Sequence, residues 1–308
     1  GSQAFADAAT RLSECGTDVD GWIVLTHVDL SDDDPRDLRV RNAFGEVYPY
    51  ALCPSYEEVR DYCRTLVAET LHSAPLRGVV LEACGPMGLD HSSDHDKINL
   101  AQWSLVERQL LSLCFCDACA AGMRDVGIDP AELALTVRQA LARSTSTMED
   151  ALGVTCAATA AFRVSRSTTL QRDVTEAARQ VNGEASVTLH ASASPWATGS
   201  FAATTADALT LVNGAVANCW GESRATRELA DLGPMTSNLG AYLRLDHEWS
   251  ANEGIVSHYA EVGVRELHLY HLGLLSETSL GNAQRLTSTW RRTGDARLDQ
   301  IEESLSDG

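Results

Sequence analysis

The chain has 308 residues, of which 44% are hydrophobic and 22% are charged. This composition supports a sizeable buried core and excludes an intrinsically disordered chain. Acidic residues outnumber basic ones by 43 to 24, which gives a formal net charge of −19. Repulsion from phosphates therefore argues against a nucleic-acid partner. No apolar run reaches the ~18 residues that a membrane-spanning helix needs, so we expect no membrane association.

The beginning of the chain carries no recognisable targeting signal. Residues 1–2, Gly-Ser, are typical of the remnant of a cleaved tag, and an amphipathic helix with Phe5, Ala8 and Leu12 follows directly. We therefore interpret residues 3–308 as a single catalytic domain and expect a cytoplasmic protein.

Short, nearly continuous apolar runs alternate with amphipathic segments along the chain, which is typical of parallel strands buried on both faces. The runs that read as strands are 22–28, 79–84, 186–191, 215–220, 241–247 and 266–271. The spacing after residue 186, about 25 residues, is the size of a strand–helix unit. The pattern predicts an α/β fold of the (β/α)8, TIM-barrel-like type that lacks N-terminal strands, so the runs count as strands 3 to 8. A doubly wound open sheet is the alternative. No glycine-rich dinucleotide loop supports it, and we expect no organic cofactor.

Two long insertions, 29–54 and 85–183, interrupt this alternation. Both follow the carboxyl end of a predicted strand, which is the face of a barrel where active sites lie. Within the second insertion, the Asp129-Pro130 pair predicts the start of a helix, with Asp as the N-cap and Pro at the first helical position.

Nine cysteines are scattered through the chain, an odd number that makes a poor disulfide framework. Cys114, Cys116 and Cys119 form a C-x-C-x-x-C run, which brings three thiolates within one turn, as tetrahedral Zn²⁺ requires. Cys53 is the favoured fourth ligand and Cys63 the alternative. Such a closed four-cysteine site predicts a structural zinc that holds the second insertion in place. Reduced cysteines without a metal are the competing interpretation.

Carboxyl groups at strand ends indicate acid–base chemistry. Glycoside hydrolysis needs two of them across the scissile bond. Glu82 follows the buried run 79–81, where loss of solvation raises the pKa of a carboxyl and suits a general acid. Asp246 and Glu248 lie on one face of a later strand, and either can serve as the partner. Arg244 shares that face, and its pairing with Asp246 would leave Asp246 a structural role.

Other polar and aromatic groups at strand ends are candidates for substrate binding. Histidine and tyrosine donate to sugar hydroxyls, and an aromatic face stacks on a pyranose ring. The strand-end candidates are His27, His190, Trp220 and Tyr270. Trp196 is a further candidate for stacking, although for either tryptophan a place in the packed core is at least as good an interpretation.

The densest polar segment, 90–97, follows the strand of Glu82. We interpret it as a substrate-binding loop in which His91, His95 and Lys97 contact sugar hydroxyls or a carboxylate. A divalent-metal site and a solvated loop are the alternatives.

Between residues 42 and 123 the chain resembles the family-42 β-galactosidases. The resemblance rests on the order of Cys53-Pro-Ser-Tyr-Glu-Glu-Val-Arg60, then Val79-Val-Leu-Glu82, then Cys114-Phe-Cys-Asp-Ala-Cys119. In that family the cysteines hold a structural zinc, and the strand-4 glutamate is the general acid/base. The superfamily carries its nucleophile at the end of strand 7, where Asp246 and Glu248 lie. Leu81 stands where the family has an asparagine.

Together these patterns predict a glycoside hydrolase that acts on a neutral oligosaccharide or glycoside by a two-carboxylate retaining mechanism. A metal-dependent sugar isomerase or epimerase and a non-catalytic sugar-binding barrel are the alternatives. The expected partner is a carbohydrate, and a homo-oligomer is compatible with the sequence.

Overall fold

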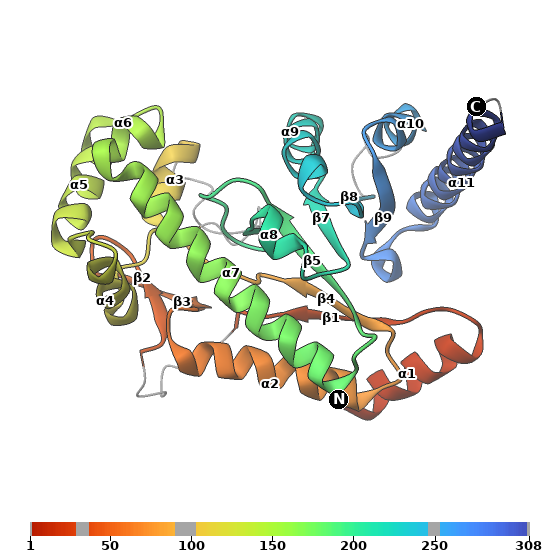
Figure 1. The fold of residues 1–308 in the computed structure, drawn as a ribbon, viewed down its shortest axis with the longest axis horizontal. Coiled ribbons are helices and arrows are strands. Elements are labelled where there is room, and N and C mark those ends of the chain that lie inside the picture. The colour runs from red at the N-terminus through yellow and green to blue at the C-terminus, as the bar shows by residue number, and fades with distance from the viewer. Residues whose placement is uncertain (1, 29–36, 90–102, 246–252, 307–308) are drawn as a thin grey trace. The chain divides into compact units, whose positions relative to one another are not determined.

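The computed structural model describes residues 2–28, 37–89, 103–245 and 253–306 (Figure 1). The chain divides into two compact units, residues 1–213 and 214–308. Each unit contains parallel strands and helices, and each is described by itself.

Three parallel strands form the sheet of the first unit. They are β1 (Asp20–Val24), β4 (Gly78–Glu82) and β5 (Ser186–Ser192), and the two-residue β6 (Ala202–Ala203) pairs with β5. The register places Val24 opposite Glu82 and Leu81 opposite Leu189. Because the strands are parallel, their carboxyl ends meet at one edge, which places Glu82 beside the residue that follows Leu189.

Two long helices of the first unit pack against each other, α2 (Glu57–Ser73) and α7 (Cys156–Val181) (Figure 1). The buried residues of α2 are Val59, Cys63, Val67 and Leu71, and this spacing of four gives one apolar stripe. The unit also contains α1 (Ser2–Glu14) and the one-turn α8 (Ala206–Leu209).

A separate hydrophobic cluster forms where the two insertions meet. The first insertion contributes an antiparallel hairpin, β2 (Arg39–Arg41) and β3 (Val47–Leu52). The second contributes α3 (Leu105–Leu111), α4 (Asp117–Asp125), α5 (Pro130–Arg143) and α6 (Met148–Leu152). Asp129 accepts hydrogen bonds from the amides of Ala131 and Glu132 at 2.8 and 3.2 Å, which confirms the predicted helix start.

The second unit has its own three parallel strands, β7 (Gly214–Asn218), β8 (Leu239–Arg244) and β9 (Val264–Tyr270). Its helices are α9 (Glu222–Leu232), α10 (Glu253–Glu261) and α11 (Glu277–Ser306). Every residue of β7 is buried, and all of them except Asn218 are apolar or glycine.

The six predicted strands are all present, each shifted by a few residues at its ends. The hairpin within 29–54 was not predicted, because its strands are short and its alternation is interrupted by Pro49. In the part of the chain that the structure describes, no helix is long and apolar enough to cross a membrane.

We predict that Leu81→Ala lowers the free energy of unfolding by about 2–5 kcal/mol, because Leu81 is fully buried at the centre of the first unit's sheet. Urea denaturation followed by circular dichroism measures this loss. Val80→Ala on the same strand is the matched control, since Val80 is only partly buried and its loss is smaller. Equal losses in the two variants would contradict the burial pattern of β4.

Candidate active site and cysteine centre

Glu82 ends β4 at the carboxyl edge of the first unit's sheet, and two side chains lie close to its carboxylate. Ser200 Oγ donates a hydrogen bond of 2.7 Å to Oε1. Nδ1 of His190 lies 4.0 Å from Oε2. The carbonyl of Ser200 also accepts from the amide of Ala83 at 2.9 Å. Ser200 therefore holds both the side chain of Glu82 and the backbone directly after it.

His190 is buried at 1% exposure on β5. Its ring stacks on Phe201 with centroids 4.7 Å apart and an interplanar angle of 6°. The ring of Trp22, on β1, lies 5.8 Å away at an angle of 56°. These contacts fix the imidazole next to Glu82, and the sheet register accounts for the proximity of the two residues.

The backbone that follows Glu82 is held by side chains from distant segments. The hydroxyl of Thr26 is shared between two acceptors, the carbonyl oxygens of Ala83 and Gly85, at 2.7 and 2.8 Å. The amide of Gln171, on α7, donates to the carbonyl of Cys84 at 3.3 Å. A Cβ added to Gly85 would lie only 2.6 Å from Ser167 Oγ, so this position needs glycine for close approach to α7. The loop after Glu82 is therefore tightly constrained.

The other predicted binding residues fall into three groups. In the first unit, His27 forms an isolated bridge with Ala51, and its ring lies edge-on to Tyr50 at 5.8 Å. Trp196 is 9% exposed and belongs to the hydrophobic cluster of the insertions. Trp220 and Tyr270 are in the second unit. The predicted binding residues His91, His95 and Lys97 and the predicted catalytic residues Asp246 and Glu248 lie outside the described residues.

In the second unit, Trp220 and Tyr270 belong to an aromatic cluster at the carboxyl ends of β7, β8 and β9. Trp220 stacks on Tyr242 with centroids 5.5 Å apart and lies 5.4 Å from Tyr270. The guanidinium carbon of Arg244 lies 4.9 Å from the centroid of the Trp220 ring, a cation–π contact. The structure thus gives Arg244 an aromatic neighbour within its own unit.

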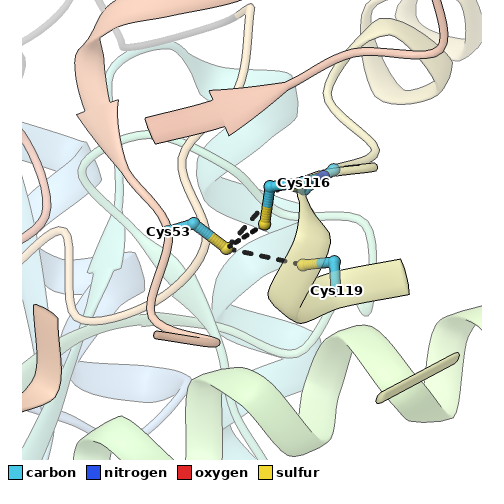
Figure 2. Close-up of side chains that lie close together, drawn as sticks. Cys53, Cys116 and Cys119 are labelled. Atoms are coloured by element: carbon cyan, nitrogen blue, oxygen red, sulfur yellow. Dashed lines mark hydrogen bonds between the residues drawn. The ribbon is translucent and has the colours of Figure 1, made fainter. Parts of the chain in front are cut away.

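Four buried cysteines form the second group of chemical interest, at the centre of the insertion cluster. The Sγ atoms of Cys53, Cys114, Cys116 and Cys119 all lie within 4.8 Å of one another. Cys53 Sγ is 3.4 Å from that of Cys119, 3.5 Å from that of Cys116 and 3.7 Å from that of Cys114. Figure 2 shows Cys53, which follows β3, facing Cys116 and Cys119 at the start of α4.

This donor set fits a tetrahedral metal ion. Four thiolates at a Zn–S distance of about 2.3 Å have sulfur atoms about 3.8 Å apart, close to the observed separations. The sulfurs are too far apart for a disulfide, whose S–S bond is about 2.05 Å. Hydrogen bonds with Cys114 and Cys119 lower the pKa of Cys116, whereas hydrogen bonds with Cys114 and Cys116 raise the pKa of Cys53. The thiols therefore compete for protons that a metal ion would replace.

The four-cysteine set resolves the choice of fourth ligand between the two candidates. Cys53 is in the group, and Cys63 is not. Cys63 lies on the buried stripe of α2, and burial raises the pKa of its thiol to about 12. A thiol kept protonated in an apolar setting behaves as a core residue.

Sequence reasoning missed Ser200, Phe201, Thr26 and Gln171. Ser200 and Phe201 lie in a loop after β5 and have no motif or spacing that links them to Glu82. Of these four residues, only Thr26 had a signal in the sequence that could have indicated a role at the site. It directly precedes the candidate His27, just after β1.

Comparison with known proteins gives a fold and no family. No family model matches the sequence, and no curated protein matches it. Among solved structures, the catalytic domain of a β-amylase from Paenibacillus polymyxa has a TM-score of 0.57 at 11% identity, covering 94% of this chain and 86% of that one. A β-galactosidase from the Antarctic haloarchaeon Halorubrum lacusprofundi has a TM-score of 0.52 at 12% identity, covering 87% of this chain and 45% of that one.

An agarase also matches, with a TM-score of 0.46 at 10% identity over 85% of this chain and 38% of that one. The neighbours are glycoside hydrolases. The chain has an α/β fold of the TIM-barrel type. The described residues contain six long parallel strands, three in each unit, which confirms the six strands that the sequence predicted.

We predict that Cys63 makes the protein less stable as the pH rises. Its pKa is raised in the folded state, so its contribution is fully present below the unfolded value of about 8.5 and is lost as the pH rises toward 12. The slope is about 1.4 kcal/mol per pH unit for one proton. Urea denaturation of the wild type and of Cys63→Ala at several pH values between about 8 and about 11 measures it as the difference between the two slopes, because buried thiols such as Cys84 and Cys219 add to the slope of the wild type.

Cys63→Ala should flatten this alkaline slope while lowering the stability at neutral pH, because the buried sulfur is lost. Cys15→Ala is the control, since Cys15 is exposed and should leave the slope unchanged. An unaltered slope in Cys63→Ala would contradict the assignment of Cys63 as a buried, protonated thiol.

Proposed function

We propose that the protein is a glycoside hydrolase with Glu82 as its general acid/base. The observation that carries the proposal is the position of Glu82 at the carboxyl end of a parallel strand, with its carboxylate bonded to Ser200 and flanked by His190. Active sites of barrel enzymes are built at these strand ends. The resemblance of the segment around Glu82 to family-42 β-galactosidases, and the fold shared with a β-amylase and a β-galactosidase, support the same assignment.

The proposed mechanism is a double displacement on a neutral oligosaccharide or glycoside. Glu82 protonates the leaving oxygen, while Asp246 or Glu248 attacks the anomeric carbon. Glu82, now ionised, then takes a proton from the water that hydrolyses the glycosyl–enzyme intermediate. In this proposal His190 donates to a sugar hydroxyl, and His27, His91, His95, Lys97, Trp220 and Tyr270 provide further substrate contacts. The whole of 3–308 serves as one catalytic domain.

The cysteine centre has a structural role in this proposal. Cys53, Cys114, Cys116 and Cys119 would hold one zinc ion with no open coordination position, so the metal adds folding free energy and takes no part in the chemistry. It would fasten the hairpin of the first insertion to the start of α4.

We predict that Glu82→Gln lowers turnover by about 10²-fold or more, because the amide cannot transfer the proton. Sugar binding should change little, since the shape of the side chain is nearly the same. A panel of aryl glycosides and oligosaccharides, assayed by release of aglycone and of reducing sugar, identifies the substrate and measures the loss. Azide should restore activity toward aryl glycosides with good leaving groups, by replacing the base-activated water.

The control is Glu58→Gln, an exposed glutamate in the first turn of α2 that should leave turnover unchanged. Activity of Glu82→Gln within a few-fold of the wild type would rule Glu82 out. The anomer of the first-formed product, followed by NMR, tests the retaining assignment, and an inverted product would recast the second carboxylate as a base.

We predict about one zinc ion per purified chain, measured by inductively coupled plasma mass spectrometry. Cys116→Ser should lose most of the metal and melt at a lower temperature, because thiolate ligation contributes to folding. Cys156→Ser is the matched control, a buried cysteine of the same hydrophobic cluster that is outside the four-cysteine group. Metal-free protein in which all four thiols titrate freely would contradict the site.

A further inference from the structure

Arg163 is a buried cation on α7, with 5% of its surface exposed. Its guanidinium donates to three main-chain carbonyls, at 3.1 Å to Ser112, 3.2 Å to Pro86 and 2.8 Å to Ala197. None of these acceptors carries a charge, and its Nε is buried without a hydrogen-bond partner. A buried cation is strongly unfavourable unless a negative charge lies nearby, so the site needs a source of negative charge.

The cysteine centre supplies that charge. Arg163 lines a small cavity of about 20 Å³ together with Cys53, Cys114 and Cys119. Arginine is not deprotonated in proteins, so Arg163 is a cation at neutral pH and lies beside thiols that would be thiolates when they bind a metal ion. One divalent ion and four thiolates carry a net charge of −2, by simple addition. The guanidinium of Arg163 would therefore offset part of the negative charge that a bound metal ion leaves unneutralised.

The carbonyls that Arg163 holds belong to three segments that meet around the two sites. Ser112 precedes the ligand Cys114 by two residues. Pro86 lies in the loop that follows Glu82, and Ala197 lies in the loop that leads to Ser200. Through Ser200, whose hydroxyl bonds the Glu82 carboxylate, the Ala197 loop contacts the candidate acid directly.

We propose that Arg163 is the internal counter-cation of the cysteine metal centre and that it couples this centre to the two loops that position Glu82. It is a positioning residue, since it contacts neither the carboxylate nor, in the proposed reaction, the sugar. The inference rests on the proposed metal site, and only its meaning for catalysis rests on the proposed role of Glu82. The test below needs no substrate, so a failure of the hydrolase assignment is seen separately.

The first measurement is the rate at which the purified protein releases its metal to a chromogenic chelator. Arg163→Met should release it about tenfold faster or more, the usual size of the effect when a partner outside the ligand set is removed. Arg166→Met is the matched control. Arg166 lines the same cavity from the next turn of α7, but its guanidinium lies over the Phe162 ring, so its loss should leave the rate near that of the wild type.

The second measurement is hydrogen–deuterium exchange of peptides that cover 83–89 and 194–201. Three amides report on the coupling. In the first segment Ala83 is bonded to the Ser200 carbonyl and Leu89 to Ser112 Oγ at 3.0 Å, and in the second Ala197 is bonded to the Ser194 carbonyl at 3.1 Å. Removal of the metal from the wild type should raise exchange in both peptides. In metal-loaded Arg163→Met the exchange should already be raised, while Arg166→Met should match the wild type.

Arg163→Lys separates the two roles and serves if the methionine variant does not fold. Lysine keeps the charge but loses the planar fork that reaches three carbonyls. We expect slow metal release together with raised exchange in both loops. Metal release from Arg163→Met at the wild-type rate would overturn the counter-cation role. Wild-type protection in either Arg163→Met or Arg163→Lys would overturn the coupling. A wild-type protein without bound metal would overturn the counter-cation role and the proposed zinc together, whereas missing hydrolase activity alone would leave this inference intact.

Discussion

Four thiols confined within 4.8 Å of one another set the arrangement of the insertions in the first unit. Sulfur atoms at this spacing cannot all ionise without a compensating cation, and they are too far apart to form disulfides. The elements that carry them come from separate parts of the chain, Cys53 after β3 and the other three around the start of α4. The hydrophobic cluster of α3, α5, α6 and the hairpin surrounds this point.

The position of Glu82 depends on a different constraint, which acts at the end of its strand. Beyond β4 the backbone no longer has the regular hydrogen bonds of the sheet, so other groups must satisfy it. Thr26, Gln171 and Ser200 provide them, from three segments that are far apart in the sequence. The same Ser200 that accepts from the backbone amide of Ala83 also donates to the Glu82 carboxylate, so one residue holds both the loop and the side chain.

The fold by itself leaves the chemistry open, because TIM-barrel-type architectures host many unrelated reactions. The identities of 10–12% to a β-amylase and a β-galactosidase are evidence of a shared architecture only. The proposal of a glycoside hydrolase therefore depends on Glu82 and on its neighbours Ser200 and His190. His190 lies beside Glu82 because the parallel register brings the carboxyl ends of β4 and β5 side by side.

The sequence determined the features that depend on local pattern. Apolar runs located all six long strands, Asp129-Pro130 located the start of α5, and the C-x-C-x-x-C spacing located three of the four clustered thiols. These features depend on neighbours along the chain, so periodicity and short motifs can specify them.

Only the tertiary structure decided between Cys53 and Cys63, gave Glu82 its hydrogen bond from Ser200, and placed the buried cation Arg163 beside the thiols. It also placed Trp196 in the core, where its sequence context had equally favoured a binding role. Each of these outcomes joins residues that are tens of residues apart, and the free energy that selects them comes from burial and charge compensation. Those contributions exist only once the chain has folded, and no spacing in the sequence records them.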